Sequence, residues 1–96
     1  MTPNNNTEEF YKKLKEQLSD TSLWPAPYLY KFIVPSSVAK IKEIEDIFDH
    51  IGAVITKKES RTGKYTSVSI NVRMKNPDAV IAKYKEVGKV EGVISL

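Results

Sequence analysis

The sequence predicts a single α+β domain in which two helices cover one face of a four-stranded antiparallel sheet, with an extra helix at the N-terminus. The length of 96 residues fits one domain. Segments rich in β-branched and aromatic residues alternate with segments in which apolar residues recur every three or four positions. The composition, 41% hydrophobic and 28% charged, is that of a folded globular protein.

The N-terminal part predicts a helix followed by a linker. Thr7 is suited to cap this helix, and the apolar residues Phe10, Leu14 and Leu18 recur at four-residue spacing along one side of it. Residues 19–27 combine Ser, Asp, Thr and Pro, which is typical of a linker.

The chain therefore divides into an N-terminal helix and linker, residues 1–27, and a main domain, residues 28–96. Ser36 or Ser37 is suited to cap the first helix of the main domain, and Asn76 the second. The expected elements are a strand at 28–34, a helix at 38–51, strands at 53–60 and 65–73, a helix at 76–87 and a strand at 90–96. This β-α-β-β-α-β order is that of the ferredoxin-like sandwich.

The two middle strands are expected to form a hairpin with one polar and one apolar face. A four-residue loop places Lys58 opposite Ser67 and Thr56 opposite Ser69. The alternate positions carry β-branched residues, as a half-covered antiparallel sheet requires. The polar face is then open to bind a ligand or partner.

Several classes of function find no support in the residues. The chain has no cysteine, so it has no thiolate metal site and no cysteine nucleophile. Its single histidine, His50, has no carboxylates at metal-ligand spacing, and no Gly-rich phosphate loop is present. We therefore expect no metal, no cofactor and no enzymatic activity. No apolar run is long enough to cross a membrane and no signal peptide precedes the domain, which predicts a cytoplasmic protein without a membrane partner.

Positive charge is concentrated in one segment. Residues 57–75 carry six basic side chains and one acidic side chain. Such side chains can hold an anion, although lysine and arginine on an exposed hairpin also discourage aggregation between sheet edges. The candidate residues for binding a ligand or partner are Lys31, Lys58, Arg61, Lys64, Tyr65, Ser67, Ser69 and Arg73.

Single-stranded RNA or another nucleic acid is an alternative ligand. Residues 63–68 resemble the basic-glycine-aromatic motif of RNA-recognition modules, in which rings on the open sheet stack on bases. Tyr65 is one such ring, but Ser67 stands where the second ring would be.

Leu29 and Ile33 are also expected on the open face, and two apolar residues there need a cover. The stripe of the N-terminal helix is one candidate. A second copy of the chain, paired through the sheet face or a sheet edge, is the other.

Three segments resemble the YbeD-like family, a domain of unknown function that also carries the label lipoic acid-binding regulatory protein. They are residues 30–34, 59–68 and 90–96. The resemblance implies a ferredoxin-like fold similar to the ACT domains, which are small regulatory modules, and a link to lipoate metabolism. ACT domains usually have a glycine in the loop after the first strand, whereas residues 34–37 here are Val-Pro-Ser-Ser.

The residues and the resemblance together predict a non-catalytic regulatory or interaction module. Its expected partner is another protein or a small anionic ligand, and carboxylate-bearing metabolites, lipoate included, suit Lys58, Arg61 and Arg73.

Overall fold

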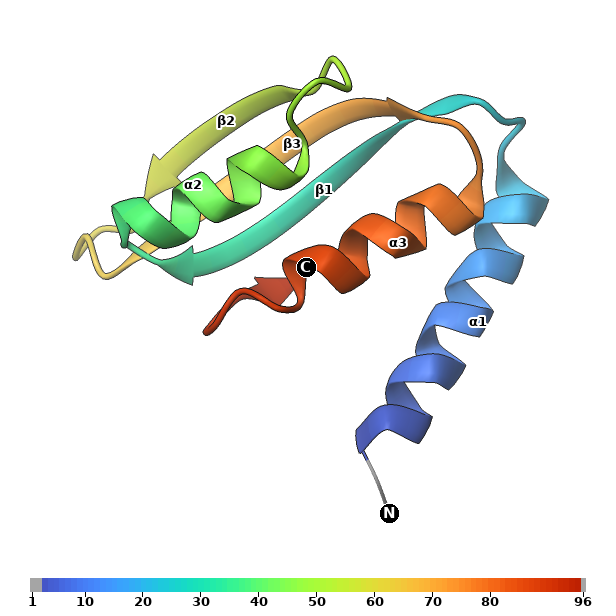
Figure 1. Cartoon of the computed structure of the whole chain (residues 1–96), viewed down its shortest axis with the longest axis horizontal. Coiled ribbons are helices and arrows are strands. Elements are labelled where there is room, and N and C mark those ends of the chain that lie inside the picture. The colour runs from blue at the N-terminus through green and yellow to red at the C-terminus, as the bar shows by residue number, and fades with distance from the viewer. Residues whose placement is uncertain (1–2, 96) are drawn as a thin grey trace.

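A computed structural model describes residues 3–95 of the chain, with side chains from residue 8 onward. Three helices and four strands make up this part of the molecule (Figure 1). In chain order they are α1 (Pro3–Thr21), β1 (Ala26–Pro35), α2 (Val38–Ile47), β2 (Val54–Glu59), β3 (Tyr65–Met74), α3 (Pro77–Val87) and β4 (Ile94–Ser95).

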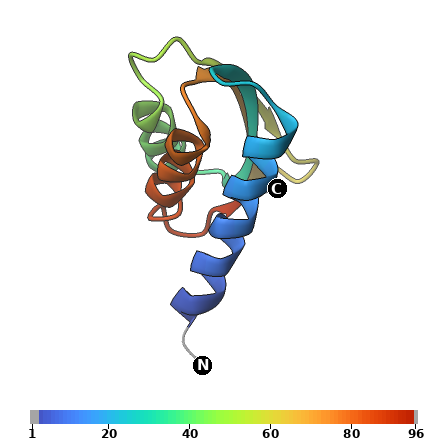
Figure 2. The same cartoon turned by 90° about the vertical axis from the view of Figure 1, so that its right-hand side faces the viewer.

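The strands form one antiparallel sheet in the order β2-β3-β1-β4. Helices α2 and α3 make up a second layer on one side of this sheet, as Figure 2 shows. The predicted hairpin register is confirmed, because Lys58 pairs with Ser67 and Thr56 pairs with Ser69. The α+β class with a four-stranded antiparallel sheet is therefore confirmed.

The core lies between the sheet and α2 and α3. Alternate residues of the two central strands point into it, and Tyr30, Phe32, Val68 and Ile70 are completely buried. The Tyr30 hydroxyl donates a 3.0 Å hydrogen bond to the Val80 carbonyl of α3, so the polar end of this ring is satisfied inside the core.

The two core helices begin where local chemistry predicts. Ser37 is the N-cap of α2, and its side chain accepts from the backbone N–H of Lys40. Asn76 caps α3 in the same way, accepting from Ala79 N–H at 2.8 Å, and Pro77 occupies the first turn.

The second helix is shorter than expected. Helix α2 ends at Ile47, although Phe48 and Ile51 continue its apolar spacing. His50 and Gly52 both have positive φ angles, of 65° and 75°, which a continuing right-handed helix does not allow. The last predicted strand is also shorter, since within the described residues only Ile94 and Ser95 belong to β4; Leu96 lies outside them.

Helix α1 begins earlier than predicted and packs elsewhere. It starts at Pro3, so Thr7 lies inside the helix and is not its cap, and it extends to Thr21, into the predicted linker. Its contacts are with α3, at the side of the molecule, as Figures 1 and 2 show. Of the two candidate covers for the open face, the N-terminal helix is therefore ruled out, because α1 packs on α3.

Aromatic and ionic contacts hold α1 in this place. The rings of Tyr11 and Tyr84 lie 6.4 Å apart, and Lys15 pairs with Asp78 at 2.9 Å. The indole N–H of Trp24 donates to a carbonyl in the last turns of α1, so the segment that follows the helix is tied back to it.

Candidate functional site

The face of the sheet that no helix covers, which we call the outward face, has a regular layout of side chains. Three rows cross it from β1 over β3 to β2. From one end, the rows are Leu29–Asn71–Val54, Lys31–Ser69–Thr56 and Ile33–Ser67–Lys58, with Ile94 of β4 beside Ile33. In the second and third rows the middle strand, β3, contributes a serine, and both of its neighbours contribute larger side chains.

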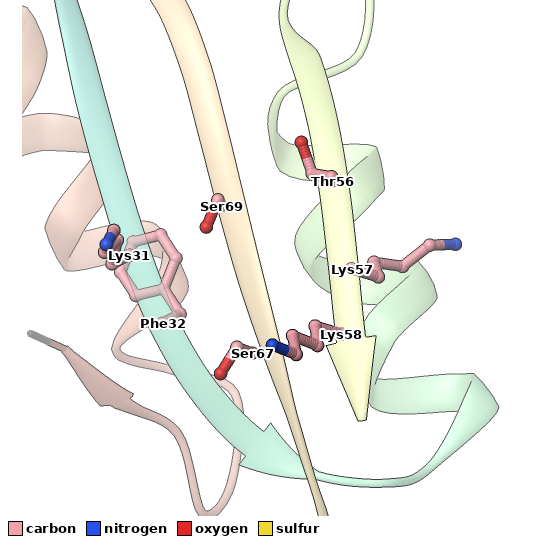
Figure 3. Close-up of a pocket in the computed structure, with 7 residues that line it drawn as sticks. All are labelled: Lys31, Phe32, Thr56, Lys57, Lys58, Ser67 and Ser69. Atoms are coloured by element: carbon pink, nitrogen blue, oxygen red, sulfur yellow. The ribbon is translucent and has the colours of Figure 1, made fainter. Parts of the chain in front are cut away.

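This difference in side-chain size produces a shallow trough along β3. Ser67 and Ser69 form its floor, Lys31 borders it from β1, and Thr56 and Lys58 border it from β2. Its volume is about 350 Å³. Figure 3 shows the Lys58 side chain lying across β3 toward Ser67.

Two further residues lie beside the trough, but their side chains do not point into it. Phe32 and Lys57 stand at alternate positions on their strands, so their side chains point to the other face of the sheet. Lys57 extends away from the trough in Figure 3 and pairs there with Glu45 of α2 at 3.3 Å.

The trough is positively charged. Lys31 and Lys58 form no ion pair with any residue in the described part of the chain. The outward positions of the four strands carry no Asp or Glu, while Arg73 adds a third cation on the same face. Ammonium groups beside hydroxyl donors favour an anion, because hydrogen bonds from a charged donor to an anionic acceptor are among the strongest in proteins.

The structure brings together four of the eight predicted site residues, namely Lys31, Lys58, Ser67 and Ser69. Tyr65 lies at the hairpin end of β3, opposite Pro35, and 45% of it is exposed. Arg61 and Lys64 lie in the turn beyond it.

Arg73 does not belong to the basic hairpin, contrary to the sequence-based grouping. It pairs with Pro27 at the opposite end of β3. It lies eight positions beyond Tyr65 along an extended strand, which is a distance of about 26 Å. Thr56 was absent from the predicted set, although its pairing with Ser69 already placed it on the polar face.

The titratable groups with raised pKa values lie in the core and not in the trough. Burial raises the pKa of Tyr30 and of Tyr84, and the hydrogen bond between the Tyr84 and Tyr28 hydroxyls, 2.8 Å long, raises that of Tyr84 further. Burial also raises the pKa of Tyr11. These neutral phenols belong to the packing between β1, α3 and α1.

His50 stands apart from these groups. It lies in the turn after α2, where its Nε2 is 3.1 Å from Asp49, and 90% of its side chain is exposed. Among the residues that the structure describes, no three His, Asp or Glu side chains are grouped closely enough to hold a metal ion.

A family model described as "Protein of unknown function (DUF493)" matches residues 21–96. The chain belongs to this family, which is the YbeD family that the sequence resembles. The match begins at the last residue of α1, so this helix lies almost entirely outside the matched region. No curated protein and no solved structure matched the chain. None of the described helices is long and apolar enough to span a membrane.

Proposed function

We propose that this domain is a non-catalytic regulatory or interaction module that binds an anionic group in the trough of its outward face. The observation that carries the proposal is the pair of lysines, Lys31 and Lys58, which border one trough and have no carboxylate partner among the described residues. Hydroxyl groups on its floor and its β2 side add neutral donors for the same anion.

We also propose that the fold is ferredoxin-like and similar to the ACT domains. The strand order β2-β3-β1-β4 supports this assignment, as does the placement of one helix after β1 and one after β3. In such a sandwich the helices occupy one face of the sheet, which leaves the other face for binding.

A carboxylate with a short apolar chain suits the trough. Lys31 stands between Leu29 and Ile33 on β1, so a chain that leaves the lysine in either direction meets an aliphatic side chain. Lipoate has this chemistry, and we therefore include it among the ligands to test.

Nucleic acid receives less support as a ligand. Binding of single strands depends on rings that stack on successive bases. Among the outward positions of the described strands, Tyr65 provides the single ring, and it lies outside the trough.

A titration monitored by nuclear magnetic resonance tests the proposal. Lipoate, octanoate and inorganic phosphate are added in turn to isotope-labelled protein, with octanamide as the uncharged control. We expect the anions to shift the backbone signals of Ser67 and Ser69, and octanamide to leave them in place.

Two variants locate the binding. Replacing both lysines (Lys31→Ala with Lys58→Ala) is expected to weaken anion binding by about tenfold or more, because two exposed charged contacts of up to about 1 kcal/mol each are lost. Lys57→Ala, on the same strand but facing the other side, is expected to bind as the parent does. Unchanged binding in the double variant would remove the trough from consideration.

A further inference from the structure

We propose that the outward face docks an acidic amphipathic helix of a partner protein, which lies along the trough above β3. This inference rests on the proposed function and deepens it, because it assigns the bound anion to the carboxylates of a protein segment. It uses three properties of the face, namely its exposed aliphatic residues, its charge and its dimensions.

Aliphatic side chains stand on the outward face around the trough. Leu29 on β1 is 52% exposed, Val54 on β2 is 67% exposed, and Ile94 on β4 is 53% exposed. Leu29 and Val54 face each other across Asn71, while Ile94 lies beside Ile33 near the other end. Grouped apolar residues on one surface mark a site of protein contact more often than isolated ones.

The charge of the face determines what kind of partner fits. Lys31, Lys58 and Arg73 provide positive charge at three levels along it, and the hairpin adds Arg61 and Lys64 at one end. A second copy of the chain, packed face to face, would bring cations against cations, which disfavours self-association through this face. A partner with carboxylates complements it.

The dimensions of the face match a helix. From Tyr65 to Arg73 the outward face extends about 26 Å along β3, and the strands on either side of β3 are about 10 Å apart. A helix is about 10 Å wide and rises about 1.5 Å per residue, so a helix of about 17 residues covers the length of β3. The apolar stripe of this helix would contact Leu29, Val54 and Ile94. Acidic residues on either side of the stripe would then lie close to Lys31 and Lys58.

Designed peptides provide the probe. One is a helical peptide of about 18 residues with leucines on one side and glutamates on both flanks, and its control has lysines in place of the glutamates. We expect the acidic peptide to shift the signals of Leu29, Lys31, Ser67 and Val54, with an affinity that falls as salt increases. The basic peptide is expected to leave these signals in place.

Matched variants test the apolar part of the contact. Leu29→Glu places a carboxylate on the outward face beside the trough and is expected to weaken binding of the acidic peptide by about tenfold or more. Val38→Glu changes an aliphatic residue that is 86% exposed on α2, on the helical side of the molecule, and is expected to leave binding unchanged.

Each outcome supports or overturns the inference. Equal binding of the acidic and basic peptides, or an unchanged affinity in Leu29→Glu, overturns it. Binding of a uridine oligonucleotide of about 12 nucleotides, in the absence of peptide binding, overturns it in favour of nucleic acid. If lipoate, octanoate or phosphate binds in the trough and the acidic peptide does not, this inference fails while the proposed function stands; if none of them binds, both fail.

Discussion

The two faces of the sheet are made by the same strands and have opposite properties. On the inward face, Tyr30, Phe32 and Val68 are fully buried, and the polar end of the tyrosine is hydrogen-bonded. On the outward face, Leu29 and Lys31, which flank Tyr30 on β1, are exposed. Stability is therefore concentrated on one face, and the other is free to carry a binding surface.

The comparison teaches that odd and even positions on β1 can be assigned to the exposed face or to the core from the alternation of side chains alone. Side chains on a strand alternate between faces, so neighbouring residues have different surroundings. Substitutions at adjacent positions then provide matched tests of the assignment.

The largest effect is expected for a core ring. Phe32→Ala removes a completely buried side chain and is expected to lower the free energy of unfolding by about 3–5 kcal/mol, because the lost burial and the cavity both contribute. Leu29→Ala, three positions earlier on the outward face, is expected to change it by less than about 1 kcal/mol. Urea unfolding of both variants measures the difference, and equal losses would contradict the division between faces.

The inward face also predicts a dependence of stability on pH. Because the pKa values of Tyr30 and Tyr84 are raised in the folded state, their contribution is complete below about pH 10, the ordinary range of a tyrosine, and is lost as the pH rises above it. The unfolded chain releases those protons first, and this favours unfolding in alkali.

Tyr84→Phe tests this dependence. At neutral pH we expect it to cost about 1 kcal/mol, since the hydrogen bond with Tyr28 is removed. Above pH 10 its stability is expected to fall less steeply than that of the parent, because one titrating group is gone. Urea unfolding at pH 7 and at about pH 10.5 compares the two proteins, and a variant that loses as much stability in alkali as the parent would contradict the expectation.

The smallest effects are expected for the neighbouring lysines of β2. Lys57→Ala breaks the partly exposed pair with Glu45 and is expected to cost between zero and about 1 kcal/mol of stability, with anion binding intact. Lys58→Ala is expected to leave stability unchanged and to weaken anion binding several-fold, by less than about tenfold. Thermal unfolding measures the stability of both variants, and ligand titration measures their anion binding. If both variants lost the same amount of stability and of affinity, the two faces would not be independent at these positions.

Sequence reasoning succeeded where local chemistry controls the structure. The caps Ser37 and Asn76, the hairpin register and the alternation on β1 all depend on residues close together in the chain. The trough could be anticipated in part, because the pairing of Lys58 with Ser67 follows from the length of the hairpin loop.

Sequence reasoning failed where the structure depends on contacts between residues far apart in the chain or on the length of an extended strand. The apolar stripe of α1 shows that this helix must pack against another element, but it does not identify that element. The ring that Tyr11 contacts, Tyr84, lies far from α1 in the sequence. Arg73 was grouped with the hairpin because it is near in sequence, whereas an extended strand carries its end far from its beginning. Helix α2 was predicted too long because Phe48 and Ile51 continue its apolar spacing, although the helix ends at Ile47 and the chain then turns through the positive φ angles of His50 and Gly52.

The short pairing of β4 has a consequence for the edge of the sheet. Strand β1 pairs with β3 at ten positions but with β4, among the described residues, at two. Local openings of β4 therefore require much less free energy than global unfolding, and its amide hydrogens exchange with solvent early while those between β1 and β3 stay protected. Each opening frees the edge of β1 at Phe32 and Ile33, and this is where the domain would first exchange a strand with a neighbouring molecule at high concentration.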